Sequence, residues 1–326
     1  MSYWSLTTNV HNPESGNGTI TRVSWPSGTY LSDMLVTTSL QLRNPANSSR
    51  LVWIGYSVQD PAGNWFNVPS TAVRLQPLAE SGVLNVSWSV PPGQLPATGY
   101  FNAAVAVWLS PPEKLGAVRL EEIERHQAFQ VFDFLDDFTY LNQSIWHEGM
   151  HDLGRSLLNP GNVNASAAGL ELRLSANKYE GGEVASSNLY LYGSYEARIQ
   201  CPTAPGSLCT FFLYQRNADN RADEIDIEIF SGGSRLVQFS TWVNGERTNY
   251  ALAKLSFDPD AAYHNYRIDF YKGHLTFFID GQAVQTWVTG LPSHPMQITL
   301  NAWWPFWLSG QEPTTDVYMH VEWVRH

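Results

Sequence analysis

Residues 223–228 read Asp-Glu-Ile-Asp-Ile-Glu, so that carboxylates alternate with β-branched apolar residues. Side chains on a β-strand point to opposite faces with a period of two, which places Glu224, Asp226 and Glu228 on one face. The two isoleucines between them then point toward a core. Carboxylates crowded into one space take different pKa values, and a pair of that kind cleaves glycosidic bonds. The alternative interpretation is a solvated strand face.

The composition excludes several classes of partner. The chain has 326 residues and a formal net charge of -11, from 19 Lys and Arg against 30 Asp and Glu. This charge argues against nucleic-acid phosphates or an anionic membrane surface as the partner. Aromatic residues make up 13% of the chain. They favour strands, and they also provide flat apolar platforms of the kind that sugar rings cover.

No positively charged and then apolar leader opens the chain. The longest apolar run, residues 103–109, is far too short to span a bilayer. We therefore expect a soluble protein. It is either an extracellular, secreted form whose leader was removed or a cytoplasmic protein.

Residues 1–130 read as short strands separated by turn residues, a pattern typical of a β-sandwich. One segment, residues 120–125 (Leu-Glu-Glu-Ile-Glu-Arg), favours a helix or else a linker. Four tryptophans in this part are more typical of a sandwich core than of a sugar platform, and we expect them in the core: Trp53, Trp65, Trp88 and Trp108.

A second unit begins at Phe132, and short strand-like segments continue from there to the end of the chain. Between two of them, Asp280-Gly281 predicts a tight two-residue hairpin. We expect an all-β unit of about two hundred residues. The predicted domains are thus 1–130, an accessory sandwich that binds carbohydrate or acts as a spacer, and 131–326, which contains the carboxylate stretch.

The two cysteines, Cys201 and Cys209, flank a segment rich in Pro, Gly and Ser that reads as a turn. A disulfide across this turn fits an oxidising compartment, and two buried free thiols fit the sequence equally well. The sequence argues against zinc binding by these two residues alone, because no second pair of cysteines exists.

A competing motif occupies residues 147–151, His-Glu-Gly-Met-His, which matches the H-E-x-x-H pattern of zinc proteases. That chemistry needs His147 and His151 one helical turn apart, with Glu148 activating water. Gly149 and Gly154 oppose a helix here. We expect a polar loop, and we keep a zinc metalloprotease as a remote alternative.

Further motifs lie in a fixed order around the carboxylate stretch: residues 193–198 (Gly-Ser-Tyr-Glu-Ala-Arg), 211–214 (Phe-Phe-Leu-Tyr), 237–239 (Val-Gln-Phe), 264–266 (His-Asn-Tyr), 278–281 (Phe-Ile-Asp-Gly), 300–303 (Leu-Asn-Ala-Trp) and 307–308 (Trp-Leu). With these motifs, residues from about 132 to 326 resemble glycoside hydrolase family 16, most closely its bacterial lichenase-type β-glucanases. The resemblance implies a concanavalin-like β-jelly-roll catalytic domain after the N-terminal sandwich, which we expect to be Ig-like.

By this resemblance Glu224 is the nucleophile, Glu228 is the general acid/base, and Asp226 helps to set their ionisation. The implied reaction is a retaining hydrolysis of β-1,3-1,4-glucan through a covalent glycosyl-enzyme. Retention needs carboxyl groups about 5–5.5 Å apart, whereas residues i and i+4 of a strand have Cα atoms roughly 13 Å apart. Two long glutamate side chains that lean over Asp226 shorten this gap, and an aspartate at either end would reach less far.

The stretch has no extra residue between Asp226 and Glu228, which in this family resembles lichenases rather than laminarinases or agarases. The chain departs from the lichenase pattern at four places: Ala222 replaces a Trp, residues 240–242 (Ser-Thr-Trp) replace Asn-Trp-Tyr, Ala185 replaces a sugar-contacting Arg, and Glu322 replaces an Asp that is a calcium ligand in some members. We therefore expect the chemistry to transfer better than the subsite specificity. No cofactor is required, and a structural calcium is left open.

The resemblance also implies a set of glucan-binding residues: Glu183, Tyr214, Gln238, Trp242, Asn301 and Trp303. We expect a monomer that binds β-glucan polysaccharide. The alternatives are a transglycosylase on β-glucan or xyloglucan that uses the same site, a laminarin-directed β-1,3-glucanase, and a glycan-binding protein without catalysis.

Overall fold

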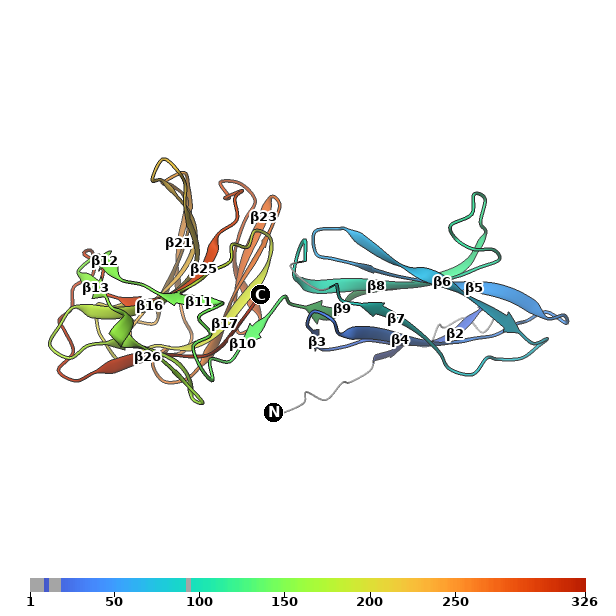
Figure 1. Ribbon diagram of the computed structural model, residues 1–326, viewed down its shortest axis with the longest axis horizontal. Helices are drawn as coiled ribbons and strands as arrows, with labels where there is room; N and C mark the ends of the chain where they lie inside the picture. The colour runs from blue at the N-terminus through green and yellow to red at the C-terminus, as the bar shows by residue number, and fades with distance from the viewer. Residues whose placement is uncertain (1–8, 12–18, 92–94) are drawn as a thin grey trace. The chain divides into compact units, whose positions relative to one another are not determined.

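The computed structural model describes residues 9–11, 19–91 and 95–326, and the chain divides into two compact units, Met1–Phe134 and Leu135–His326 (Figure 1). Regular structure in the described ranges consists of β-strands, apart from one 3₁₀ turn, Pro160–Asn162. The predicted all-β class is therefore confirmed. Within the same ranges, no helix has the length and apolar character that crossing a membrane requires.

The first unit contains two mainly antiparallel sheets. The four-stranded sheet has the order β1 (Asn9–His11), β2 (Ile20–Trp25), β4 (Leu35–Leu42) and β7 (Leu84–Ser89). The five-stranded sheet has the order β3 (Thr29–Tyr30), β9 (Arg119–Val131), β8 (Gly99–Trp108), β5 (Arg50–Gln59) and β6 (Trp65–Leu75).

Alternating apolar residues of both sheets build one core in the first unit. Val36 and Leu40 of β4 and Val52 and Ile54 of β5 belong to the same buried cluster. Trp88 is also in this core, as predicted. The other three tryptophans depart from the prediction, because Trp65 is exposed and Trp53 and Trp108 are only half-buried. Their strands place them on the outward face of the five-stranded sheet, since they alternate with the buried positions.

The helix or linker predicted for residues 120–125 is wrong, because these residues lie within strand β9. Val105 of β8 pairs with Ile123 of β9, and Ala104 pairs with Glu124. Leu, Glu and Arg have high helix propensity, but backbone pairing along a neighbouring strand overrides so weak a preference.

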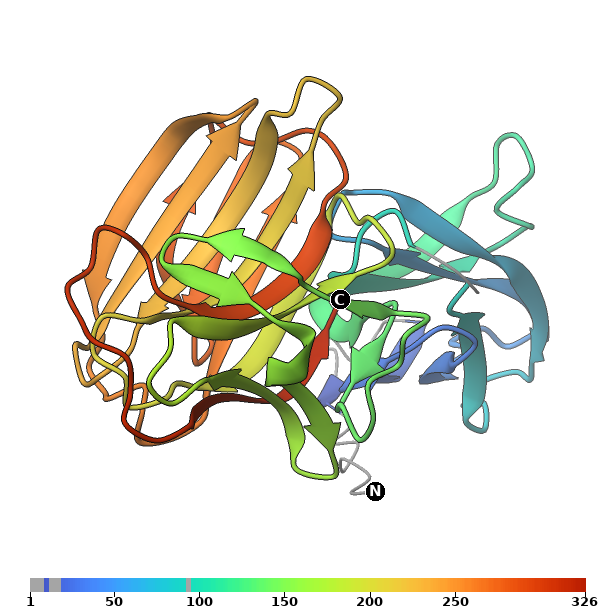
Figure 2. The same ribbon diagram turned by 60° about the vertical axis from the view of Figure 1, so that its left-hand side comes forward.

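The second unit also contains two sheets (Figure 2). The eight-stranded sheet has the order β14 (Val163–Ser166), β15 (Gly169–Leu174), β26 (Val317–Arg325), β17 (Gly193–Gln200), β22 (His264–Tyr271), β23 (His274–Ile279) and β24 (Gln282–Trp287), with β10 (Leu135–Asp136) pairing β26. The nine-stranded sheet has the order β12 (His151–Leu153), β13 (Ser156–Leu158), β16 (Glu180–Ser186), β25 (Gln297–Trp303), β18 (Leu208–Arg216), β19 (Ala222–Phe230), β20 (Leu236–Val243) and β21 (Glu246–Lys254), with β11 (Trp146–Glu148) pairing β16.

The core of the second unit lies between these sheets. Ile225, Ile227 and Ile229 of β19 are fully buried. Phe239, which pairs with Ile227, meets Phe277 of the other sheet with ring centroids 4.8 Å apart. One face of β19 is therefore committed to the core, and its other face is left for the carboxylates.

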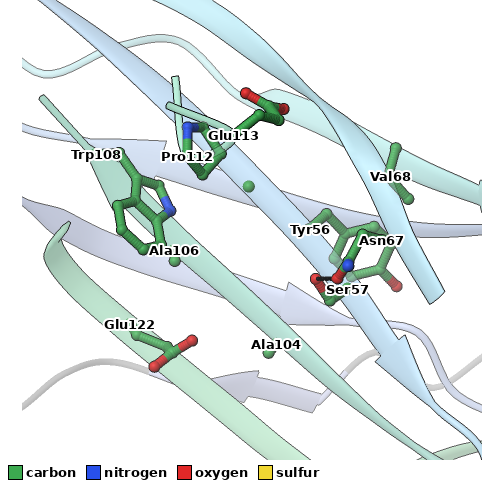
Figure 3. Close-up of a pocket in the computed structure, with 11 residues that line it drawn as sticks. Tyr56, Ser57, Asn67, Val68, Ala104, Ala106, Trp108, Pro112, Glu113 and Glu122 are labelled. Atoms are coloured by element: carbon green, nitrogen blue, oxygen red, sulfur yellow. Dashed lines mark hydrogen bonds between the residues drawn. The ribbon is translucent and has the colours of Figure 1, made fainter. Parts of the chain in front are cut away.

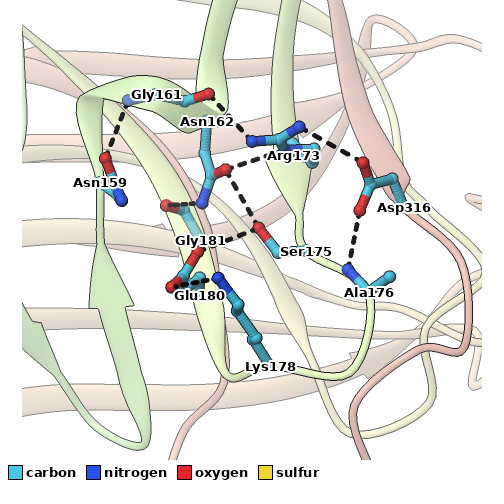
Figure 4. A network of polar contacts seen from close by, with 10 residues as sticks. All are labelled: Asn159, Gly161, Asn162, Arg173, Ser175, Ala176, Lys178, Glu180, Gly181 and Asp316. Atoms are coloured by element: carbon cyan, nitrogen blue, oxygen red, sulfur yellow. Dashed lines mark hydrogen bonds and ion pairs between the residues drawn. The ribbon is translucent and has the colours of Figure 1, made fainter.

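A polar network fixes the start of β16, the strand that carries Glu183 (Figure 4). Asn162 Nδ2 donates to the Gly181 carbonyl at 3.0 Å, and Arg173 Nε donates to Asn162 Oδ1 at 2.8 Å. Arg173 also pairs with Asp316 at 3.3 Å. Gly181 fits because a Cβ there would lie 2.0 Å from the Ala302 carbonyl oxygen of β25. The network thus ties the start of β16 to the 3₁₀ turn and to β15, and Gly181 lets β16 lie close to β25.

Candidate active site

Strand β19 carries three carboxylates on the face opposite its buried isoleucines. The strand lies between β18 and β20 in the nine-stranded sheet, so both of its edges are paired. Glu224 and Glu228 are half-buried and Asp226 is buried. The structure therefore has the period-two arrangement that the alternating sequence predicts.

Burial raises the pKa of all three carboxyl groups. The pKa of Glu224 rises to about 7, through burial and the nearby charge of Glu228, while a hydrogen bond from Asp226 lowers it. The pKa of Glu228 rises to about 8, through burial and the charge of Asp226. The pKa of Asp226 rises well above its usual range, first through burial and then through the charge of Glu224. The hydrogen bond from Asp226 thus favours the ionised form of Glu224.

Neighbouring strands place hydrogen-bond partners directly beside two of the carboxylates. Ser240 pairs with Asp226 across β19 and β20, and its hydroxyl donates to Asp226 Oδ2 at 2.5 Å. Gln238 pairs with Glu228, and its amide donates to Glu228 Oε2. Opposite residues in an antiparallel pair share a face, so these contacts follow from the register.

Two predicted aromatic residues flank Glu224. Tyr214 of β18 pairs with Glu224 on one side, and Trp242 of β20 pairs with it on the other. A hydrogen bond from Trp242 lowers the pKa of Asp226. The guanidinium of Arg247 lies 5.7 Å from the Trp242 ring centroid, and its charge lowers the pKa of Glu228.

A second row of side chains leads away from Glu228 across three strands. Thr210 of β18 pairs with Glu228 and also with Asn301 of β25, which in turn pairs with Glu183 of β16. Asn301 Nδ2 donates to Glu183 Oε2 at 3.0 Å. His151 Nε2 donates to Glu183 Oε1 at 2.9 Å, and this hydrogen bond raises the pKa of His151. Glu183 is thus a buried carboxylate held from two sides.

Trp303 completes the predicted set. It lies two residues after Asn301 on β25, and its Nε1 donates to Thr210 Oγ1 at 3.1 Å. All six predicted glucan-binding residues therefore share a sheet face with the carboxylates. Their role in binding stays a prediction.

Sequence reasoning missed three residues of this face. Thr210 and Ser240 continue the period of two from Tyr214 and Gln238 along their strands, so the same alternation could have found them. Arg247 gave no such signal. A β-bulge between Thr241 and Trp242 shifts the register that brings Arg247 opposite Trp242.

The structure argues against a zinc site at the H-E-x-x-H motif. His147 lies on β11 and His151 on β12, so the helix that zinc ligation needs is absent. Two close approaches explain the glycines. A Cβ on Gly149 would lie 2.5 Å from Glu183 Oε1, and Gly154, at φ +57°, has room for no Cβ beside Trp303 and Trp304. Among the described residues no group of three potential metal-ligating side chains occurs.

The position suggested for calcium does not fit that ion. Glu322 lies on β26, and one of its carboxylate oxygens is 2.5 Å from Arg198 Nε. A carboxylate that already pairs with a guanidinium is a poor ligand for a hard cation, which needs six to eight oxygen ligands. A structural calcium elsewhere stays untested.

The two cysteines lie where the sequence places them, on either side of the turn between β17 and β18. Both are buried free thiols. Burial raises the pKa of the Cys201 thiol well above its usual value, and a hydrogen bond with Cys209 raises it further. Thiols of that kind are unreactive as nucleophiles.

Comparison with known proteins assigns the second unit. The model of glycosyl hydrolases family 16 matches residues 155–325, which is more than half of the chain. The chain belongs to glycosyl hydrolase family 16. The match includes β19 and all six predicted glucan-binding residues, and it makes the protein a glycoside hydrolase.

Relatives of this chain include β-glucanases. That of Bacillus amyloliquefaciens is 30% identical over 207 residues, which are 59% of this chain and 86% of the relative. That of Bacillus subtilis (strain 168) is also 30% identical over 207 residues, covering 85% of the relative. The solved structure of the Bacillus licheniformis β-glucanase superposes with a TM-score of 0.55 and 29% identity, over 59% of this chain and 96% of that chain. The jelly-roll fold predicted for the second unit is therefore confirmed.

Proposed function

We propose that this protein is a retaining endo-β-glucanase that hydrolyses β-1,3-1,4-glucan through a covalent glycosyl-enzyme. The observation that carries the proposal is the row of three carboxyl groups on β19. Their pKa values leave Glu224 ionised more readily than Glu228. The row thus offers a glutamate whose ionised form is favoured by Asp226 and a glutamate that keeps its proton up to about pH 8, the carboxylate and the acid that retention needs.

In the first step Glu228 donates its proton to the glycosidic oxygen while a Glu224 oxygen attacks the anomeric carbon. The bond between that carbon and the leaving oxygen breaks, and the free sugar leaves with a new hydroxyl. In the second step Glu228, now a carboxylate, takes a proton from water. The resulting hydroxide attacks the anomeric carbon and releases Glu224.

Asp226 is the positioning group between the two glutamates. Its carboxyl shares a hydrogen bond with that of Glu224, which raises the pKa of Asp226 and lowers that of Glu224. Ser240 and Trp242 donate to Asp226 in turn. This chain of donors fixes the orientation of the nucleophile and lowers its pKa relative to that of an isolated buried carboxyl.

The substrate class rests on the relatives and on the spacing of the motif. The relatives named above are β-glucanases. The unbulged spacing in residues 224–228 resembles that of the lichenases. One departure from the lichenase pattern has a physical explanation, because Ser240 supplies a hydrogen bond to Asp226. Ala222 is half-buried beside Arg216 across the strands, and nothing in the structure explains the loss of the Trp there.

A panel of polysaccharides tests the proposal: lichenan, barley β-glucan, laminarin, xyloglucan and agar, with linkage analysis of the products. We expect release of reducing ends from lichenan and barley β-glucan, and oligosaccharides rather than single sugars. Cleavage confined to laminarin would assign a β-1,3-glucanase. Longer products formed on addition of an oligosaccharide acceptor would assign a transglycosylase, and no reducing ends from any polysaccharide would contradict hydrolysis.

The pH dependence of activity follows from the raised pKa values of Glu224 and Glu228. Below about pH 7 Glu224 takes up a proton and loses its nucleophilic form, and above about pH 8 Glu228 loses the proton that it must donate. We therefore expect kcat/KM on barley β-glucan to follow a bell with its maximum between these values. Asp226→Asn removes a charge that raises the pKa of Glu228, so the alkaline limb should move to lower pH. The control is Asp219→Asn in an exposed turn, and a maximum below pH 5 would contradict the assignment.

Glu183→Gln is expected to raise KM about tenfold and to change kcat much less. The carboxylate accepts from Asn301 and His151 at the end of the row, away from the reacting carboxyls. An amide can no longer accept from both. Steady-state kinetics on barley β-glucan gives the split, with Glu148→Gln on β11 as the matched control. Unchanged KM in the Glu183 variant would remove Glu183 from the binding site.

A further inference from the structure

The first unit carries a groove on the outward face of its five-stranded sheet (Figure 3). Its volume is about 300 Å³. Residues of β5, β6, β8 and β9 line it, together with Pro112 and Glu113 from the segment between β8 and β9. Ligand pockets begin at about this size.

Small residues form the floor of the groove. Gly55 of β5 pairs with Ala106 of β8, and Ser57 pairs with Ala104. These outward positions lie in the middle of the sheet, where larger side chains would stabilise pairing better, because Gly and Ala are poor strand formers. Gly55 lies at a β-bulge in the pairing of β5 with β6, where glycine suits the backbone. The small side chains of Ala104 and Ala106 leave the space above the sheet.

An indole forms one wall. Trp108 lies at the end of β8 and is half-buried. A Cβ on Gly55 would lie 3.3 Å from its Nε1, so the ring rests close against the floor. The Arg119 guanidinium lies 5.7 Å from the ring centroid and helps to hold it. In Figure 3 the ring of Trp108 stands at the edge of the groove near Pro112. An indole and a proline ring are surfaces on which the C–H face of a pyranose can pack.

Polar groups stand around this apolar wall. Ser57 Oγ donates to Asn67 Oδ1 at 2.7 Å, which leaves the Asn67 amide N–H groups to donate to a ligand. Glu113 accepts from Ser70 Oγ at 3.3 Å, and Glu122 pairs with Arg119. Carboxylates accept hydrogen bonds from hydroxyl groups, whereas they repel phosphates, sulfates and carboxylates.

We propose that this groove binds a segment of a neutral polysaccharide, with a pyranose ring packed on Trp108 and its hydroxyls bonded to Asn67 and Glu113. The combination of an aromatic wall, a floor of small residues and acceptor carboxylates fits an uncharged polyhydroxyl ligand. The site lies in the first unit, outside the residues that match family 16. It therefore goes beyond the proposed hydrolysis, which does not need it.

The test is native electrophoresis of the full chain in gels that contain barley β-glucan, laminarin, xyloglucan or galactomannan. All variants carry Glu224→Gln in addition, so that the polysaccharide survives the run. Trp108→Ala is compared with Trp65→Ala, which removes an exposed Trp from the same sheet outside the groove. We expect Trp108→Ala to weaken retardation at least about tenfold on one of these polysaccharides, or about 1.4 kcal/mol, and Trp65→Ala to change it less than twofold.

A second variant keeps the test decisive if Trp108→Ala unfolds. Asn67→Ala with Glu113→Gln removes two polar groups from exposed positions, and thermal melts report the folding of each variant. Equal retardation of the control and of every folded groove variant on all four polysaccharides would overturn the proposal. Stronger retardation by anionic polygalacturonate than by the neutral polymers would also overturn it. Hydrolysis of a short oligosaccharide by the unmodified chain reports the proposed function separately.

Discussion

A chain carrying Glu224→Gln is expected to hydrolyse mixed-linkage glucan at least about 10⁴-fold more slowly than the unmodified chain. The amide of glutamine is a very weak nucleophile, so the bond to the anomeric carbon does not form. The fold should tolerate the change, because burial already raises the pKa of Glu224 to about 7 and a neutral side chain suits this place. The measurement is the rate of reducing-end release from barley β-glucan.

Two controls sharpen this prediction. Glu171→Gln makes the same chemical change at a half-buried position on β15, in the other sheet, and is expected to keep full activity. Added azide can replace the missing nucleophile on an activated β-glycoside, and the product should then be the α-glycosyl azide. A Glu224 variant with the turnover of the unmodified chain would remove the carboxylate from the mechanism.

Glu228→Gln is expected to lower the rate on polysaccharide by about 10²- to 10⁴-fold, the usual contribution of general acid/base catalysis. Formation of the glycosyl-enzyme from a dinitrophenyl glycoside should be much less affected, because that leaving group needs no proton. Azide should here yield the β-glycosyl azide, since Glu224 still forms the covalent intermediate. Gln238→Ala, which removes only the amide that donates to Glu228, is the matched comparison and should lose less. Equal losses on polysaccharide and on the aryl glycoside would contradict the acid/base role.

Glu228→Gln is also expected to change how the stability of the fold depends on pH. Burial raises the pKa of Glu228 to about 8, so the folded chain favours the protonated form. The stability associated with this protonated form is fully present below about pH 4.3, the pKa of a glutamate in the unfolded chain, and it is lost as the pH rises through 8. Glutamine cannot ionise. The Glu228→Gln variant should therefore unfold several degrees higher than the unmodified chain at pH 9 and at a similar temperature at pH 4.

The alternation at residues 223–228 was enough to predict a strand with one buried face and one carboxylate face. It could not predict the neighbours of that face. Glu183 and Asn301 are far apart in the chain, and only the order β16, β25, β18, β19 brings them into a row with Glu228. Such an order is set by long-range pairing, which a local pattern does not contain. The resemblance to family 16 identified both residues, because members of a family share one strand order and the matched motifs therefore imply it.

Local patterns also pointed to the wrong secondary structure at places where pairing between distant strands determines it. Residues 120–125 have the composition of a helix and form part of β9. Residues 147–151 match a helical zinc motif, yet Gly149 makes room for the side chain of Glu183 on β16, the strand that pairs with β11. Trp108 alternates with core positions, so its strand turns it outward into the groove of the first unit. The Ig-like topology of that unit, the monomeric state and secretion stay predictions.

The most direct test of the central claim is to trap the covalent intermediate. The unmodified chain is incubated with a 2-deoxy-2-fluoro-β-glucosyl oligosaccharide that carries a dinitrophenyl leaving group, and the digested protein is mapped by mass spectrometry. We predict one added oligosaccharide, on the peptide that contains β19 and attached at Glu224. Attachment at Glu228 or at any other residue, or steady release of dinitrophenol without an adduct, would contradict the proposed mechanism.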